Sequence, residues 1–284
     1  MIQSVFDTYG ALILSVLFVV LFFLESKFQL RKRVQNRWKR MVINFLVAIP
    51  SFVLLRLLFI PFIVWLAYKN AEWKLGLNYL FIAPYWLKAI LAFFLLDYSN
   101  YIWHIILHKM PLMWRFHVVH HSDLDLDITT SFRFHFGEMI GSVFFRGAAV
   151  ILTGASPLMV LIYEIAFDAS NQFQHSNLKI SFGLEKVLNK IFVTPRMHGI
   201  HHSQKKKETD SNFSIIFSFW DRLHRTIRLN VHQDQIVTGV PAYADKKQLT
   251  PMKLLKLPFT KIKPRVETDK MEDSSEGDNG VLKK

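Results

Sequence analysis

Cysteine is absent from the 284-residue chain, which excludes disulfides, iron–sulfur clusters and thiolate chemistry. No short-period internal repeat is visible, so a repeat architecture is not indicated. Acidic residues are scarce relative to basic ones, 22 against 35, and the formal net charge is +13. The excess Lys and Arg residues lie beside long apolar blocks rather than along a separate groove. An anionic membrane surface is therefore the better partner for this charge, and nucleic acid is not expected.

Apolar residues are abundant and fall in long blocks, with 51% hydrophobic residues and 26 phenylalanines. This composition favours an integral membrane protein over an ordinary soluble domain. We expect an all-α fold: a multi-span membrane helical bundle with a cytosolic, histidine-rich helical cap. The expected organisation is N-terminal transmembrane helices with a basic loop over 1–85, a catalytic domain over 86–230, and a polar, partly disordered tail over 231–284.

The first apolar block, Tyr9–Leu24, is long enough to span a bilayer. It lacks a preceding basic region and a small-residue cleavage site, so we predict a retained transmembrane helix rather than a signal peptide. A dense basic loop follows, from Lys27 to Arg40, and the positive-inside rule places this loop in the cytoplasm.

The next block, Val42–Ala67, is expected to cross outward with kinks at Pro50 and Pro61. The chain then re-enters near Trp86 and carries the first histidines to the cytoplasmic side. This assignment gives a multi-pass protein of a bacterial inner membrane or the endoplasmic reticulum, with its histidines on the cytoplasmic side.

The block from Met139 to Phe167 is longer than one span and contains a Gly154-Ala155-Ser156-Pro157 breaker. One long tilted helix and a hairpin of two shorter helices both fit this length. We favour the hairpin, because it returns the chain to the side that the histidine pattern requires. The segment after Glu267 is acidic and nearly free of aromatics, so disorder is expected there.

Nine of the 12 histidines fall in tight spacings or between them. Offsets of three and four residues place imidazoles on one face of a helix, so two rings can point at one metal ion. A single spaced pair is weak evidence, because helices produce it by chance, whereas three such sets together are strong evidence. One metal rarely uses more than six ligands, so eight or more convergent histidines indicate two ions. The three sets and the lone residue between them are His104 and His108; His117, His120 and His121; His175; and His198, His201 and His202.

These motifs resemble the fatty acid hydroxylase/sterol desaturase superfamily of membrane di-iron enzymes. The similar stretches are Asp97–His108, Leu112–Ser122, Phe173–Asn177, Thr194–Ser203 and Phe219–Arg222, and the resemblance covers about Leu91–Thr226. It implies that the nine histidines are ligands of two Fe ions that use O2. It also implies a separate electron donor, such as a cytochrome b5-like protein, a ferredoxin or a reductase. Ile105 departs from the family, in which arginine commonly follows the first histidine.

Other polar residues are candidates for contacts around the metals. His135 is a possible extra ligand, although capping of the following helix with Glu138 as partner is the better interpretation. Asp97 lies two helical turns before His104, so it is a candidate acceptor for a ligand's second ring nitrogen. Further candidates for such contacts are Asn171, Asn177, Asn212 and Glu138. The alternating Asp123, Asp125 and Asp127 are expected in a solvated loop, and His224 and His232 on the surface.

The function that fits best is an O2-dependent hydroxylase or desaturase of an acyl, sterol or related lipid. A zinc-dependent hydrolase would need only three protein ligands and an open site. A metal transporter would carry ligands along mid-membrane helices rather than at helix ends. Ligands alone do not distinguish hydroxylation from desaturation, and the sequence does not name the substrate. Candidate walls of a lipid pocket are Phe93, Phe94, Phe144, Phe145 and Phe167.

Overall fold

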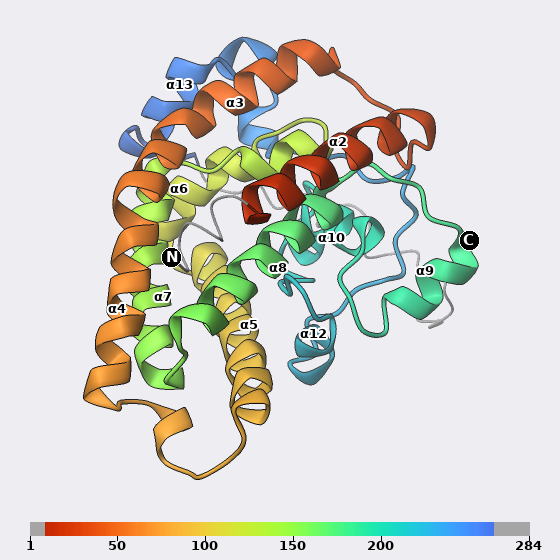
Figure 1. The fold of residues 1–284 in the computed structure, drawn as a ribbon. Helices are drawn as coiled ribbons and strands as arrows, with labels where there is room; N and C mark the ends of the chain where they lie inside the picture. The colour runs from red at the N-terminus through yellow and green to blue at the C-terminus, as the bar shows by residue number, and fades with distance from the viewer. Residues whose placement is uncertain (1–8, 264–284) are drawn as a thin grey trace.

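The computed structural model describes residues 9–263, which form a helical bundle with a cap of shorter helices (Figure 1). Within this range there are isolated β-bridges but no strands, so the expected all-α class is confirmed. The long helices are α2 (Ala11–Lys27), α3 (Arg37–Leu54), α4 (Ile60–Trp73), α5 (Tyr85–Lys109), α6 (Pro111–His121), α7 (Phe136–Thr153) and α8 (Pro157–His175). The cap adds α9 (Phe182–Leu188), α10 (Pro195–His201), α11 (Lys206–Thr209), α12 (Phe219–Leu223) and α13 (Pro251–Lys256).

Single turns complete the described chain. A π-helical turn, η2, covers Leu55–Phe59. The 3₁₀ turns are η3 (Leu77–Tyr79), η4 (Ile128–Phe132), η5 (Pro241–Tyr243), η6 (Lys246–Gln248) and η7 (Leu257–Phe259).

Three helical stretches are long and apolar enough to cross a membrane: Arg37–Tyr79, Tyr85–Lys109 and Phe136–Thr153. They contain the expected outward block, the expected re-entering helix and the first arm of the expected hairpin. The block Tyr9–Leu24 forms α2, which crosses α8 in Figure 1. With 17 described residues, α2 is not among the three stretches, so a span there stays a prediction.

The bend between α3 and α4 lies between the two prolines that predicted it. Pro50 removes a backbone donor inside α3, and the π-helical turn follows at Leu55–Phe59. Pro61 at the start of α4 also lacks an N–H donor, so it interrupts the hydrogen-bond pattern directly after the π-helical turn. Figure 1 shows the ribbon turning at this point, so that α3 lies across the bundle and α4 runs along it.

The expected hairpin is confirmed at the Gly154–Pro157 breaker. Gly154 adopts a left-handed φ of 70° and ends α7, a conformation that favours glycine. The Ser156 hydroxyl then caps α8, which begins at Pro157. A long tilted helix is thereby excluded, and the chain returns toward the level from which α7 started.

The apolar core lies between α4, α5, α7 and α8 and includes Ala67, Ala92, Val150 and Val160. Beyond residue 230, α13 also packs inward, because Leu254 joins Val47 and Val119 in a second buried cluster. The disorder expected after Glu267 lies outside the described residues.

Candidate metal centre

The structure brings all nine predicted histidines together, and they are all buried. They form two groups, and within each group one potential ligand atom from every ring lies within 4.8 Å of the others. Histidine group one contains His104, His108, His117, His121 and His201. Histidine group two contains His120, His175, His198 and His202.

Each three-histidine motif is shared between the two groups. On α6, His117 and His121 face group one, whereas His120 faces group two. On α10 and its C-cap, His201 faces group one, whereas His198 and His202 face group two. Residues four apart project from one face of a helix, and the residue between them projects to the side. Because α6 and α10 lie beside each other, their histidines form two adjacent groups.

The ring nitrogens in group two converge at hydrogen-bond distance from one another. The Nε2 atom of His175 lies 3.0 Å from that of His120 and 2.9 Å from that of His198. The Nε2 atoms of His198 and His202 are 3.1 Å apart. A neutral imidazole has one N–H donor and one acceptor, so four converging Nε2 atoms do not satisfy one another. A shared cation does satisfy them, and histidine is the commonest metal ligand.

Group one offers buried ring nitrogens in the same way. The Nε2 atoms of His117, His121 and His201 have no hydrogen-bond partner among the described residues. An uncompensated buried polar atom is costly, so three of them pointing into one group fit a metal-binding centre.

Backbone carbonyls orient several of the rings. His104 Nδ1 lies 2.8 Å from Phe213 O, His201 Nδ1 lies 2.7 Å from Ser211 O, and His175 Nδ1 lies 2.7 Å from Asn171 O. In each ring the Nδ1–H group donates, which leaves the Nε2 lone pair for a metal. Asn212 between the two cap carbonyls has a left-handed φ of 52°, a conformation that asparagine tolerates.

Burial also keeps these histidines of α6 and α10 neutral. It lowers the pKa of His120, His121, His198, His201 and His202 well below the ordinary value, and neighbouring rings lower each pKa further. The neutral imidazole is the form that binds a metal, so the environment prepares these side chains as ligands.

Comparison with known proteins agrees with this geometry. The family model described as fatty acid hydroxylase matches residues 89–226, which contain all nine histidines. Residues 89–226 thus resemble the fatty acid hydroxylase family. The resemblance expected from the motifs is thereby confirmed, and α5 to α12 form this fatty acid hydroxylase region.

The matches to curated relatives cover about half of this chain. An ornithine lipid hydroxylase from Rhizobium tropici is 30% identical over 49% of the chain and 41% of its own length. An alkylglycerol monooxygenase from Danio rerio is 30% identical over 53% of the chain and 32% of its own length. A cholesterol 25-hydroxylase from Rattus norvegicus is 23% identical over 55% of the chain and 52% of its own length. The chain thus covers about a third to a half of these relatives, and no solved structure matches it.

Asp97 does not contact the histidines of the fatty acid hydroxylase region, which corrects the expected hydrogen bond to His104. Its Oδ2 atom accepts from the indole Nε1 of Trp220 at 2.8 Å and from Phe217 N at 3.3 Å. His104 instead donates to Phe213 O. Residues seven apart share a helical face, but α12 packs beside Asp97 and supplies closer donors. Asp97 therefore connects α5 to the α12 segment.

His135 lies outside both histidine groups. Its Nδ1 atom accepts from Gly137 N at 3.0 Å and caps α7, as its preferred interpretation predicted. Its Nε2 atom lies 3.0 Å from Leu255 O. The expected pairing of His135 with Glu138 is corrected, because Glu138 Oε1 lies 3.1 Å from His117 Nδ1. Glu138 thus contacts a group-one histidine, as does Asp210, whose Oδ1 atom lies 3.7 Å from His108 Nδ1.

Asn171 contacts a group-two histidine through its backbone carbonyl and not, as the sequence suggested, through its side chain. Its amide donates to Ser131 O at 3.0 Å, while its backbone carbonyl accepts from His175. Asn177 is farther from the metal groups and binds the backbone of Arg31. His224 is exposed, as expected, and lies 3.1 Å from the Tyr98 hydroxyl.

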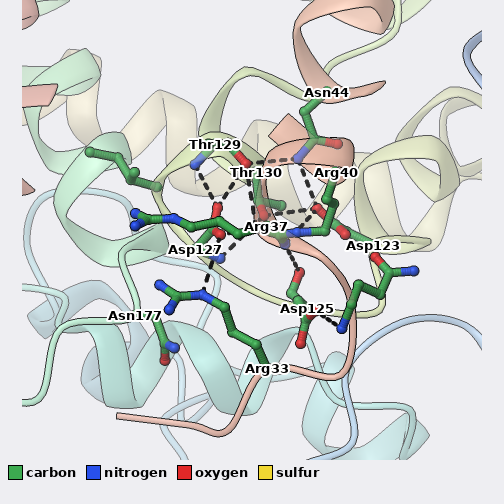
Figure 2. A network of polar contacts seen from close by, with 12 residues as sticks. Arg33, Arg37, Arg40, Asn44, Asp123, Asp125, Asp127, Thr129, Thr130 and Asn177 are labelled. Atoms are coloured by element: carbon green, nitrogen blue, oxygen red, sulfur yellow. Dashed lines mark hydrogen bonds and ion pairs between the residues drawn. The ribbon is translucent and has the colours of Figure 1, made fainter. Parts of the chain in front are cut away.

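The acidic run after α6 is buried rather than solvated, which corrects the expectation for Asp123, Asp125 and Asp127. Figure 2 shows the carboxylates of Asp123 and Asp127 facing basic side chains from the loop before α3 and from α3 itself. Arg40 forms ion pairs with Asp123 and Asp127, and Asp125 accepts from Val34 N at 2.8 Å. The basic loop that predicted membrane sidedness thus also supplies the partners that make this burial tolerable.

This network reaches the end of the helix that carries the second histidine motif. Asn44 links Asp123 to the buried Arg133, whose Nε donates to Val119 O at 2.8 Å. Arg133 also donates to the Ser122 hydroxyl at 2.9 Å. The free carbonyls at a helix C-terminus need such donors, so Arg133 fixes the end of α6 beside His120 and His121.

A cavity of about 500 Å³ lies beside histidine group two, between α2, α3, α4, α7 and α8. Its wall includes Phe134, whose ring stacks on His120 with centroids 4.6 Å apart. Of the expected pocket phenylalanines, Phe167 lines this cavity. Phe144 is 69% exposed, and the other three pack against aromatic rings elsewhere: Phe93, Phe94 and Phe145.

Three charged residues of the cavity were not anticipated: Arg146, Glu164 and Asp168, called the cavity trio below. Arg146 forms an ion pair with Glu164 and lies over the ring of Phe167, 4.3 Å from its centroid. A charged side chain inside an apolar block costs free energy in a membrane. The presence of charged residues in or next to such a block is therefore the sequence signal that could have found the cavity trio.

Proposed function

We propose that this chain is a membrane-bound lipid hydroxylase that holds two iron ions in histidine groups one and two. The observation that carries the proposal is the convergence of nine buried imidazoles from four helix ends into two adjacent groups. The fatty acid hydroxylase match and the hydroxylase and monooxygenase names of the relatives support it.

Two iron ions would supply the reductive activation of O2 that no side chain provides. In the overall reaction, a C–H group, O2, two electrons and two protons give an alcohol and water. The electrons come from a separate donor protein, such as a cytochrome b5-like protein, a ferredoxin or a reductase. The basic loop before α3 supports a cytoplasmic position for the centre, where such donors are found.

The residues of this chain hold and orient the centre. Glu138 and the Ser211, Phe213 and Asn171 carbonyls fix the ring orientations. The apolar cavity beside histidine group two receives the lipid chain and keeps water away from the reacting carbon. The relatives' names favour insertion of a hydroxyl group over removal of two hydrogens.

Metal analysis and lipidomics test this proposal together. The purified protein is expected to contain two irons per chain, and a deletion strain is expected to accumulate a lipid 16 mass units lighter than the missing one. One zinc per chain would favour a hydrolase instead. Iron without any altered lipid would favour a non-enzymatic metal-binding protein, and a lipid two mass units heavier would indicate a desaturase.

A further inference from the structure

The cavity trio places three ionisable groups among apolar walls. Arg146 lies on α7, while Glu164 and Asp168 lie one turn apart on α8. Most of the remaining wall is apolar and includes Phe18, Phe52 and Phe59. Ionisable groups at such positions are costly and usually serve a ligand or a transport path.

The trio has one cation and two carboxyl groups. Arg146 is engaged by Glu164. Asp168 makes no hydrogen bond or ion pair within residues 9–263, although its side chain lines the cavity. The trio therefore has spare acceptor capacity at Asp168 and only one cation against two carboxyl groups, although the buried Nε of Arg146 has no hydrogen-bond partner among the described residues. It suits a ligand group that donates hydrogen bonds, and it disfavours a carboxylate or phosphate.

The spacing along α8 relates the trio to the metal centre. Positions 164, 168, 171 and 175 recur at three and four residues, so they follow one face of the helix. At about 1.5 Å per residue, Asp168 lies about 10 Å and Glu164 about 16 Å before His175 along the axis. The cavity continues along this face through Asn171 to Phe134 against His120.

The cavity volume limits the ligand. About 500 Å³ is within the range of pockets that enclose one small-molecule ligand. One alkyl chain or one compact ring system fits this space better than a two-chain phospholipid does.

We propose that the substrate is a single-chain or ring lipid whose hydroxyl or ammonium group binds the cavity trio. Its oxidised carbon then lies about 10–16 Å farther along, next to histidine group two. This inference rests on the proposed function for the oxidation step, but the recognition step can be measured without turnover.

The binding test uses the purified full-length protein in detergent and three chain-matched probes: hexadecylamine, hexadecanol and hexadecanoate. Each probe displaces a fluorescent alkyl ligand. We expect the amine, the alcohol or both to bind at least about 10-fold more tightly than hexadecanoate, equivalent to about 1.4 kcal/mol. Comparison of the amine with the alcohol identifies which donor the trio prefers.

Asp168→Asn and Glu164→Gln are expected to remove this preference. Asp168→Asn is the cleaner variant, because Arg146 keeps its ion pair with Glu164. Glu72→Gln is the matched control, since Glu72 is an exposed carboxylate outside the cavity and should retain the preference. Equal binding of the three probes, tighter binding of hexadecanoate, or no binding at all would overturn the inference.

Product mapping separates this inference from the proposed function. With the loaded enzyme, the new hydroxyl should lie far from the donor group and not on the carbon next to it. Oxidation at that neighbouring carbon contradicts the spacing argument while leaving the hydroxylase proposal intact. A donor preference in a protein that oxidises no lipid contradicts the hydroxylase proposal instead.

Discussion

At the scale of single residues, the Glu138 carboxylate contacts a group-one histidine at hydrogen-bond distance. It lies 3.1 Å from His117 Nδ1 and is buried. We expect Glu138→Gln to lower iron affinity or activity by about 10- to 100-fold, the usual effect of losing a partner that orients a ligand. Iron content measured by plasma mass spectrometry checks this expectation.

His135→Ala is the control for that measurement. It removes the N-cap of α7, which costs about 1 kcal/mol of stability, but no contact to either histidine group. The variant should keep its iron, whereas His120→Ala and His201→Ala should lose it. Equal iron loss in all three would contradict the two-group assignment.

Asp97 is a second residue with a specific expectation. Asp97→Leu leaves Trp220 Nε1 and Phe217 N without their acceptor, so it should cost about 1–3 kcal/mol of stability. Asp97→Asn keeps an acceptor oxygen and should cost less, with iron retained in both variants. Thermal unfolding and iron content are measured together, and iron loss at unchanged stability would restore a metal role for Asp97.

At the scale of elements, Arg40 connects α3 to the segment after α6. Arg40→Met leaves Asp123 and Asp127 buried without their main partner, which should cost about 3–5 kcal/mol. Lys39→Met changes an exposed neighbour and should have little effect. The measurement is the thermal midpoint in detergent, and equal midpoints for the two variants would contradict the role of the network.

The same network gives a pH dependence. Burial acts to raise the Asp127 pKa, but Arg40 and Thr129 outweigh it and hold that pKa below its ordinary value. A carboxylate with a lowered folded-state pKa contributes stability above its unfolded pKa and loses it as the pH falls through the folded one. Acidification should therefore destabilise the wild type more than Asp127→Asn, as pH-dependent melting curves would show.

At the scale of the whole molecule, the absence of native cysteine makes sidedness directly measurable. Lys39→Cys, Glu72→Cys and Lys207→Cys each place one thiol at an exposed position. In intact cells, a membrane-impermeant maleimide should label only Glu72→Cys, because our proposal places the histidine cap and the basic loop on the cytoplasmic side. Labelling of Lys207→Cys would place the cap on the outside.

The sequence by itself determined which nine histidines were candidate ligands and where the chain turns. Offsets of three and four residues fix side-chain direction within one helix, so the histidine sets were readable without a structure. The hairpin was predictable for the same reason, because Gly154 and Pro157 act on their own backbone.

Only the tertiary structure decided how those local patterns combine. The division of each motif between two groups depends on how α6 and α10 lie beside each other. Asp97 was assigned the wrong partner, Glu138 was paired with His135 instead of His117, and the acidic run after α6 was expected in solvent, because their actual partners lie far away in the chain. The cavity trio depends in the same way on the packing of α7 against α8. Local spacing specifies direction along one helix, whereas burial and pairing depend on which helices meet.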